Sequence, residues 1–176
     1  MIHEVKDWML QLPLEDYVLT FDDGLYSQFF YFNELKKFKT QKYFFISTNI
    51  LCPENHDQCH SFPSSQKAHD DFFKSRIVAN YMKWSQIQEI YQTEGCLIGG
   101  HSHNHLRYDG LPIRDLYKNL MKDTDLMMLE FNKRNMSIES FCYPYNKEYF
   151  LYEEILRSHN FKYFFGKDRM AIEVLK

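Results

Sequence analysis

The sequence predicts an α/β fold that is built on parallel strands. Short runs of β-branched and aromatic residues alternate along the chain with segments in which apolar residues recur at helical spacing. Polar clusters follow directly after several of the strand-like runs, where α/β proteins usually carry their chemistry. A chain of 176 residues is too short for eight complete strand and helix units. The alternation fits either an open sheet or a barrel of parallel strands, and the short chain leads us to expect a distorted, incomplete parallel (β/α) barrel.

The first half of the chain predicts a strand, a helix and a second strand. The strands are the apolar runs at 17–21 and 42–47, and the helix lies between them at 29–39. From about 52 to 80 the sequence becomes polar and irregular, with two prolines, two cysteines and three histidines. We expect this segment to be an insertion that runs over the surface.

The next unit is a helix followed by a short strand. Ser85 and Gln88 have the spacing of a capping box, which predicts that a helix begins at Ser85. Gly95 is suited to end that helix. The apolar pair at 97–98 then predicts a third strand, which runs directly into the sequence GGHSHNH.

The remaining elements repeat the alternation. Pro112 is placed to open a long helix, and a strand at 140–143, a helix at 148–158 and a strand at 163–165 follow. The long helix is predicted by apolar residues at helical spacing: Ile113, Leu116, Tyr117, Leu120, Met121, Met128 and Phe131. The alternation thus reaches to residue 165, and we expect residues 1–176 to form one domain.

Composition and charge narrow the classes of partner. With 44% hydrophobic residues the chain can build a packed core, and a net charge of −3 provides no field that would attract nucleic acid. The N-terminus has acidic residues where a secretion signal needs a basic start, and no segment has the roughly 20 apolar residues that span a bilayer. We therefore expect a cytoplasmic protein without a membrane span. Its four cysteines are expected to be free thiols.

Three polar clusters are predicted to meet at one edge of the sheet. Asp22 and Asp23 follow the first strand, residues 101–105 follow the third, and residues 143–146 follow a later one. Because the carboxyl ends of parallel strands lie together, these side chains should converge. A turn at Asp23-Gly24 and a chance cluster of surface histidines are the alternatives without chemistry.

The histidines suggest a metal site. His101 and His105 are four residues apart, so one helical turn would bring both rings to the same side. Two imidazoles and one carboxylate leave coordination positions open, as a catalytic site requires. His101 and His103 also form an HxH pair of the kind that amidohydrolase barrels use. That pair belongs near the start of such a barrel, whereas here it lies past the middle of the chain.

Three motifs in this order resemble the polysaccharide deacetylases with a NodB homology domain. They are TFDDG at 20–24, HSHNH at 101–105 and FCYPYN at 141–146. The resemblance covers roughly residues 17–166. It implies a distorted, incomplete parallel barrel of the NodB-homology type and a single catalytic domain with the 52–80 insertion.

The resemblance also implies roles for the residues in the first two motifs. Asp23, His101 and His105 would hold a divalent metal, with Zn²⁺ favoured and Co²⁺, Ni²⁺ or Mn²⁺ as alternatives. Asp22 would be the catalytic general base that takes a proton from the attacking water. The implied reaction is the removal of an N- or O-linked acetyl group from a sugar or glycan intermediate.

The third motif implies a substrate and oxyanion site. The backbone amide of Tyr145 would help to hold the oxyanion, and Tyr143 and Pro144 would shape the floor of the pocket. The sequence departs from the family in two places. Cys142 stands where many members have an arginine that orients the base, and no Leu-x-x-His motif follows Gly166 to supply a general acid. A catalytically impaired glycan-binding protein and a metal-dependent hydrolase of another small amide are therefore the alternatives.

Other histidines are expected to have structural roles. Four ligand-type residues in the insertion match no common zinc pattern: Cys52, His56, Cys59 and His60. His159 is expected at the C-terminus of a helix. His69 and the acidic residues that follow it are expected to form a solvated stretch.

Overall fold

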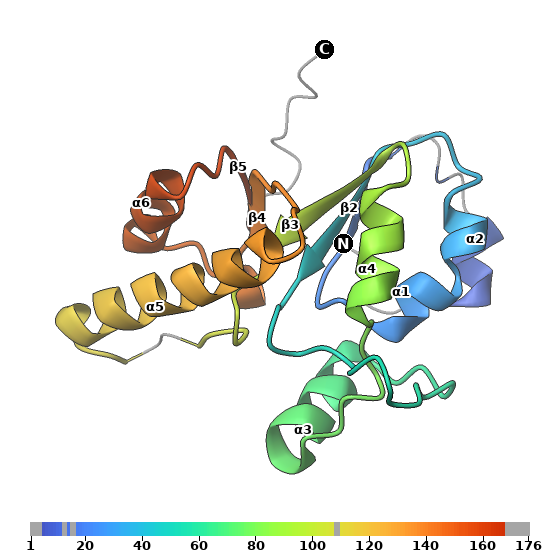
Figure 1. The fold of residues 1–176 in the computed structure, drawn as a ribbon, viewed down its shortest axis with the longest axis horizontal. Coiled ribbons are helices and arrows are strands. Elements are labelled where there is room, and N and C mark those ends of the chain that lie inside the picture. The colour runs from blue at the N-terminus through green and yellow to red at the C-terminus, as the bar shows by residue number, and fades with distance from the viewer. Residues whose placement is uncertain (1–4, 12–13, 15–16, 108–109, 168–176) are drawn as a thin grey trace.

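The computed structural model, which describes residues 5–11, 14, 17–107 and 110–167, contains one parallel sheet. Its strands follow one another in space in the same order as in the chain, and each pairs in parallel with the next. The strands are β1 (Leu19–Phe21), β2 (Lys42–Ile46), β3 (Cys96–Gly100), β4 (Ser140–Cys142) and β5 (Tyr163–Phe165). The sheet curls into a half-barrel (Figure 1), so the predicted incomplete parallel barrel is confirmed.

Helices connect the strands, and most of them pack against the sheet, whereas α3 stands apart from it (Figure 1). They are α1 (Tyr26–Phe30), α2 (Phe32–Leu35), α3 (Ser65–Ser75), α4 (Trp84–Tyr91), α5 (Ile113–Asn132) and α6 (Phe150–Ser158), with short 3-10 helices η1 (Asp7–Gln11) and η3 (Pro144–Asn146). The main hydrophobic core lies between these helices and the sheet. It joins Phe44 of β2 and Phe141 of β4 to Ile87 of α4 and Leu120 of α5.

The two faces of the sheet are filled by alternate residues of each strand, as the pleat requires. Phe44 belongs to the main core, whereas Phe45 packs with Phe165 on the inner face of the half-barrel. Gly99 and Gly100 make this packing possible. A Cβ atom on Gly99 would lie 2.6 Å from the ring of Phe45, and one on Gly100 would lie 2.7 Å from the sulfur of Met127. The glycine pair therefore lets β3 pack closely against Phe45 on one face and Met127 of α5 on the other, just before the histidine motif.

Two helices differ from their predicted bounds. Instead of one helix at 29–39, α1 and α2 meet at Tyr31, whose backbone has left the helical region. Helix α4 begins at Trp84, ahead of the predicted start at Ser85. Lys83 caps it and donates its backbone N–H to Gln86 Oε1 at 2.9 Å. Ser85 is not the cap, because its hydroxyl donates to Glu54 at 2.7 Å.

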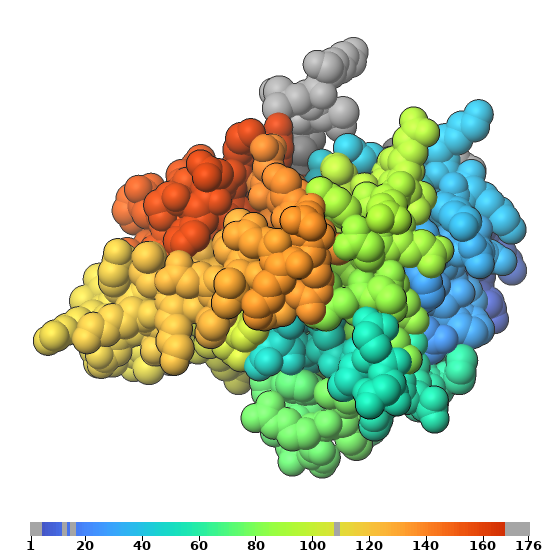
Figure 2. Space-filling model, viewed as in Figure 1, coloured from blue at the N-terminus to red at the C-terminus, as the bar shows by residue number. Residues whose placement is uncertain are grey.

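The segment 52–80 is more ordered than its composition predicts. It contains α3, which Ser64 caps by accepting from the backbone N–H of Lys67 at 3.3 Å. Ala68 and Phe72 of this helix form a second hydrophobic cluster with Tyr81. In the space-filling view α3 is a lobe at the bottom of the molecule (Figure 2). The segment is therefore not irregular throughout, because the buried face of α3 repeats every three or four residues, and its origin as a surface insertion stays a prediction.

Two expectations concern the whole chain. All four cysteines are free thiols, as expected. Among the described residues, no helix is both long and apolar enough to cross a bilayer. The cytoplasmic location stays a prediction.

Candidate active site

The three motif loops meet at the carboxyl end of the sheet, and each contains residues with a left-handed backbone. Asp23 has φ 71°, Ser102 and His105 have φ 67° and 51°, and Tyr145 and Asn146 have φ 60° and 54°. Each such residue costs of order 1–3 kcal/mol unless the surrounding structure holds it. This concentration of strained residues around one point is typical of a functional site.

Asp23 lies at the centre of the site and is 1% exposed. Its Oδ1 atom lies 3.3 Å from Nε2 of His101, 3.3 Å from Nε2 of His105 and 3.5 Å from Nε2 of His69. Its Oδ2 atom accepts a hydrogen bond from the hydroxyl of Ser65 at 2.6 Å. The structure therefore brings together the three predicted ligands and adds two residues from α3. The prediction that His69 is solvated was wrong, because only 12% of its side chain is exposed.

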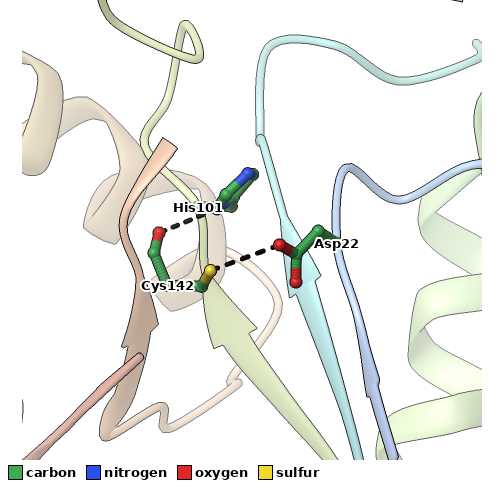
Figure 3. Close-up of side chains that lie close together, drawn as sticks. All are labelled: Asp22, His101 and Cys142. Carbon is green, nitrogen blue, oxygen red and sulfur yellow. Dashed lines mark hydrogen bonds between the residues drawn. The ribbon is translucent and has the colours of Figure 1, made fainter. Parts of the chain in front are cut away.

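His101 is oriented by a backbone carbonyl. Its Nδ1 atom lies 2.7 Å from the carbonyl oxygen of Cys142 (Figure 3). Because a carbonyl only accepts, Nδ1 carries the proton and Nε2 faces Asp23. Burial by itself lowers the pKa of His101, but Asp23 and Asp22 outweigh it and raise the pKa above its usual value.

His105 reaches the same point from the other end of the motif loop. Burial lowers its pKa to about 4, although Asp23 acts to raise it, so the ring is neutral at pH 7. The expected helical turn is absent, because Ser102 and His105 are left-handed. The rings of His101 and His105 nevertheless lie side by side, with centroids 5.0 Å apart.

Asp22 is buried beside Cys142. The thiol of Cys142 donates to Asp22 Oδ2 at 3.4 Å, and Figure 3 shows the carboxylate pointing at the sulfur. Gln28 of α1 donates to the backbone carbonyl of Asp22 at 2.5 Å. The residue that replaces the family's arginine is thus still a partner of the expected base, although a thiol is a weaker donor than a guanidinium.

The histidine loop is fixed by Asp123 of α5, a residue that the sequence reasoning missed. Its carboxylate accepts from the Ser102 hydroxyl and the His103 backbone N–H, both at 2.7 Å. It also accepts from the backbone and side-chain amides of Asn104 at 3.0 and 2.9 Å. The sequence does contain a signal for this role, because an acidic residue stands on the buried face of a helix between Leu120 and Met127.

The other candidate histidines lie away from Asp23. His103 bonds through Nδ1 to the hydroxyl of Thr48 at 2.7 Å, and burial lowers its pKa. The HxH alternative is therefore not supported, because His105 and not His103 reaches the carboxylate. His159, at the end of α6, pairs with Asp125 at 2.9 Å.

The thiols of the two insertion cysteines face nearby residues of the same segment. The thiol of Cys52 faces the backbone carbonyl of His56 at 3.7 Å, and that of Cys59 lies 3.0 Å from the Ser61 hydroxyl. Within the part of the chain that the structure describes, these residues form no group of potential metal ligands.

A cavity of about 260 Å³ opens over Asp22 and Asp23. Its wall consists of residues from all three motif loops and α3: Asp22, Asp23, Ser65, Gln66, His69, His101, His105, Tyr145 and Asn146. Tyr145 lies against His105, with ring centroids 4.6 Å apart, and against the guanidinium of Arg107 at 4.8 Å. Tyr143, which was expected to shape the pocket floor with Pro144, instead packs into the main core.

A larger cavity, of about 480 Å³, lies at the opposite end of the strands and includes Tyr43 and Tyr163. It gathers no group of potential metal ligands among the described residues. Size alone is therefore a poor guide to the site here, because the smaller cavity holds the convergent ionisable groups.

The donor atoms around Asp23 fit a first-row divalent cation. Zinc binds imidazole nitrogens and carboxylate oxygens at about 2.0–2.2 Å, so tetrahedral neighbours lie roughly 3.3–3.5 Å apart. The separations of 3.3–3.5 Å between Asp23 Oδ1 and the three Nε2 atoms match this spacing. The Nε2 atom of His69 is also buried without a hydrogen-bond partner among the described residues, as a metal ligand would be.

Comparisons with known proteins identify the family and the fold. The sequence model of the family described as Polysaccharide deacetylase matches residues 12–164. No curated protein sequence matches the chain significantly. IcaB from Ammonifex degensii is similar with a TM-score of 0.63 and 21% identity, over 93% of this chain and 68% of that one.

Two further solved structures share the fold. A de-N-acetylase from Aggregatibacter actinomycetemcomitans has a TM-score of 0.66 and 15% identity, over 93% of this chain and 71% of that one. A mutant of a CE4 family pseudoenzyme from Bacillus anthracis, described as having restored enzymatic activity, has a TM-score of 0.53 and 13% identity. There the match covers 87% of this chain and 45% of the other. At these identities the likeness shows the fold alone.

Proposed function

The chain belongs to the polysaccharide deacetylase family, and on that basis we propose that it is a metal-dependent hydrolase that removes an acetyl group from a sugar or glycan intermediate. The observation that carries the proposal is the position of Asp22. A second buried carboxylate opens into the same cavity as Asp23 and its imidazoles. One carboxylate can then hold the metal while the other moves protons.

We assign Asp23, His101 and His105 as metal ligands and Zn²⁺ as the favoured ion, with Co²⁺, Ni²⁺ and Mn²⁺ as alternatives. A divalent cation held there supplies positive charge that polarises the acetyl carbonyl. The protein's contribution is to keep the ligands ready. The Cys142 carbonyl fixes the ring of His101, and Asp123 holds the loop between the two histidines.

Asp22 acts as the general base in this proposal. It takes a proton from the attacking water while the water oxygen bonds to the acetyl carbon. Asp22 then returns that proton to the leaving nitrogen or oxygen as its bond to the acetyl carbon breaks, which gives acetate and a free amine or alcohol. The carboxylate is positioned for both steps because Cys142 and Gln28 hold its side chain and backbone.

Tyr145 completes the site. Its left-handed backbone lies at the cavity wall, and we assign its amide as the donor to the oxyanion. The ring, 39% exposed, offers a face against which a sugar can stack. A cavity of about 260 Å³ accommodates the acetyl group and part of one sugar ring, so the remainder of a glycan would lie outside.

Acetate release from a panel of acetylated sugars, with added zinc or cobalt, tests the proposal. We expect release by the wild type and loss of both release and metal binding in His101→Ala. An amine needs a proton to leave more than an alcohol does, and in this proposal the proton comes back from Asp22, so O-acetyl substrates should react faster than matched N-acetyl substrates. A protein that binds zinc and acetylated oligosaccharides but releases no acetate would be a binding protein. That is the second candidate, since one similar structure belongs to a pseudoenzyme.

A further inference from the structure

Helix α3 supplies two side chains to the carboxylate of Asp23. Ser65 and His69 are four residues apart on the helix, so they lie on the same side of it. The Ser65 hydroxyl donates to Asp23 Oδ2 at 2.6 Å, and Nε2 of His69 lies 3.5 Å from Asp23 Oδ1. The helix therefore contacts both oxygens of the central carboxylate.

The ring of His69 is held in place by packing. It stacks on Tyr81 with centroids 6.3 Å apart and lies 4.3 Å from the ring of His105. The adjacent Ala68 and Phe72 are buried in the second hydrophobic cluster, which anchors the helix. The packing of Ala68 and Phe72 thus holds α3 in the position from which His69 points at Asp23.

The donor atoms of this group are suited to a cation. The Nε2 atom of His69 is buried and makes no hydrogen bond within the described residues. Nε2 of His101 and Nε2 of His105 approach the same Oδ1 atom of Asp23 at 3.3 Å. Imidazole nitrogens and carboxylate oxygens are ligands that first-row divalent cations bind, so three Nε2 atoms that converge on one carboxylate oxygen form a donor set for such an ion.

We propose that His69 is an additional metal ligand, so that the site offers one carboxylate and three imidazoles; this rests on the proposed metal dependence of the same site. The segment 52–80 is then part of the metal centre as well as a surface lobe. A donor set with three imidazoles selects ions that prefer nitrogen, such as zinc, nickel and cobalt, over magnesium and calcium.

The number of imidazole ligands can be counted directly in the intact protein. The full chain is stripped with a chelator and reloaded with one equivalent of zinc, and X-ray absorption at the zinc edge then reports the ligands. We expect three imidazoles and one carboxylate oxygen from the protein. Two imidazoles in the wild type would overturn the proposal, and this measurement needs no variant.

Zinc affinity of variants, measured by competition with a chromophoric chelator, provides a second test. His69→Ala should weaken zinc binding by more than about 100-fold, because loss of a residue that only orients a ligand costs about 10-fold to 100-fold. His69→Gln, which keeps an uncharged polar side chain of good helix propensity, should weaken it similarly while α3 stays folded by circular dichroism. Zinc affinity within about threefold of the wild type in both variants would contradict the proposal.

His60→Ala is the matched control. This histidine lies in the same insertion, but its ring packs against Tyr26 and Phe30 and not against Asp23. The zinc affinity of His60→Ala should equal that of the wild type. A loss as large as that of the His69 variants would mean that the insertion affects zinc binding through folding alone. His101→Ala separates the two proposals. If it also binds zinc normally, the metal centre itself is wrong, whereas normal binding by the His69 variants alone defeats only the role of His69.

Discussion

At the scale of single residues, the site depends on two adjacent carboxylates with different surroundings. Asp23 faces three imidazoles, whereas Asp22 faces the thiol of Cys142. Adjacent residues at the end of a strand point in different directions, so each carboxylate can take a separate role. The two roles can therefore be separated by substitution.

Asp22→Asn tests the role of the base. The amide keeps the shape of the side chain but cannot take a proton from water, so acetate release should fall by about 100-fold to 10,000-fold. Zinc affinity should stay within about threefold of the wild type, because Asp22 is not among the proposed ligands. Parallel loss of zinc binding would show that Asp22 is itself a ligand.

Cys142 tests how the base is oriented. Cys142→Ala removes the donor to Asp22 and should lower acetate release by up to about tenfold, because one weak hydrogen bond to a charged group is lost. Cys142→Ser restores a donor of similar size and should recover most of that activity. Equal rates in the two variants would mean that the thiol is only core packing beside Phe45 and Phe165.

At the scale of elements, α5 supports the histidine loop at residues 101–105. Asp123 is 2% exposed and accepts four hydrogen bonds from residues 102–104. These hydrogen bonds to the helix offset the energetic cost of the left-handed backbone at Ser102 and His105. A buried carboxylate on a helix face is costly unless its bonds are satisfied, and here they are.

Asp123→Ala should lower the free energy of unfolding by about 3 kcal/mol, because the buried donors of the loop lose their acceptor. Asp125→Ala is the control on the same helix. Asp125 is 61% exposed and its ion pair is with His159, so its loss should change stability by less than about 1 kcal/mol. Chemical denaturation of the metal-free proteins measures both, and equal effects would contradict this role of Asp123.

At the scale of the whole molecule, the metal should link the motif loops to α3 and to the sheet. A ligand that binds only the folded state at 100 times its Kd adds about 2.7 kcal/mol of stability. We therefore expect the melting temperature to fall when a chelator removes the metal and to return on addition of zinc. A melting temperature that ignores both treatments would mean that the donor atoms hold no ion.

The sequence by itself determined the sheet and the motif residues. Strand runs, helical spacing and the order of TFDDG, HSHNH and FCYPYN predicted a partial barrel with Asp22, Asp23, His101 and His105 at one edge. These features can be predicted from the sequence because strand and helix periods are local. Parallel strands also bring their carboxyl ends together whatever lies between them.

Only the tertiary structure decided which residues surround those motifs. Ser65 lies 42 positions from Asp23, and Cys142 lies 120 positions from Asp22. His69 was interpreted as solvated because its neighbours are polar, and Asp123 went unnoticed within a helix predicted from its apolar residues. No period or motif in the sequence indicates that His69 contacts Asp23 or that Asp123 contacts Ser102. They exist because packing of Phe72 under α3 and of Met127 on α5 sets the position of each helix, and with it the direction of one polar side chain.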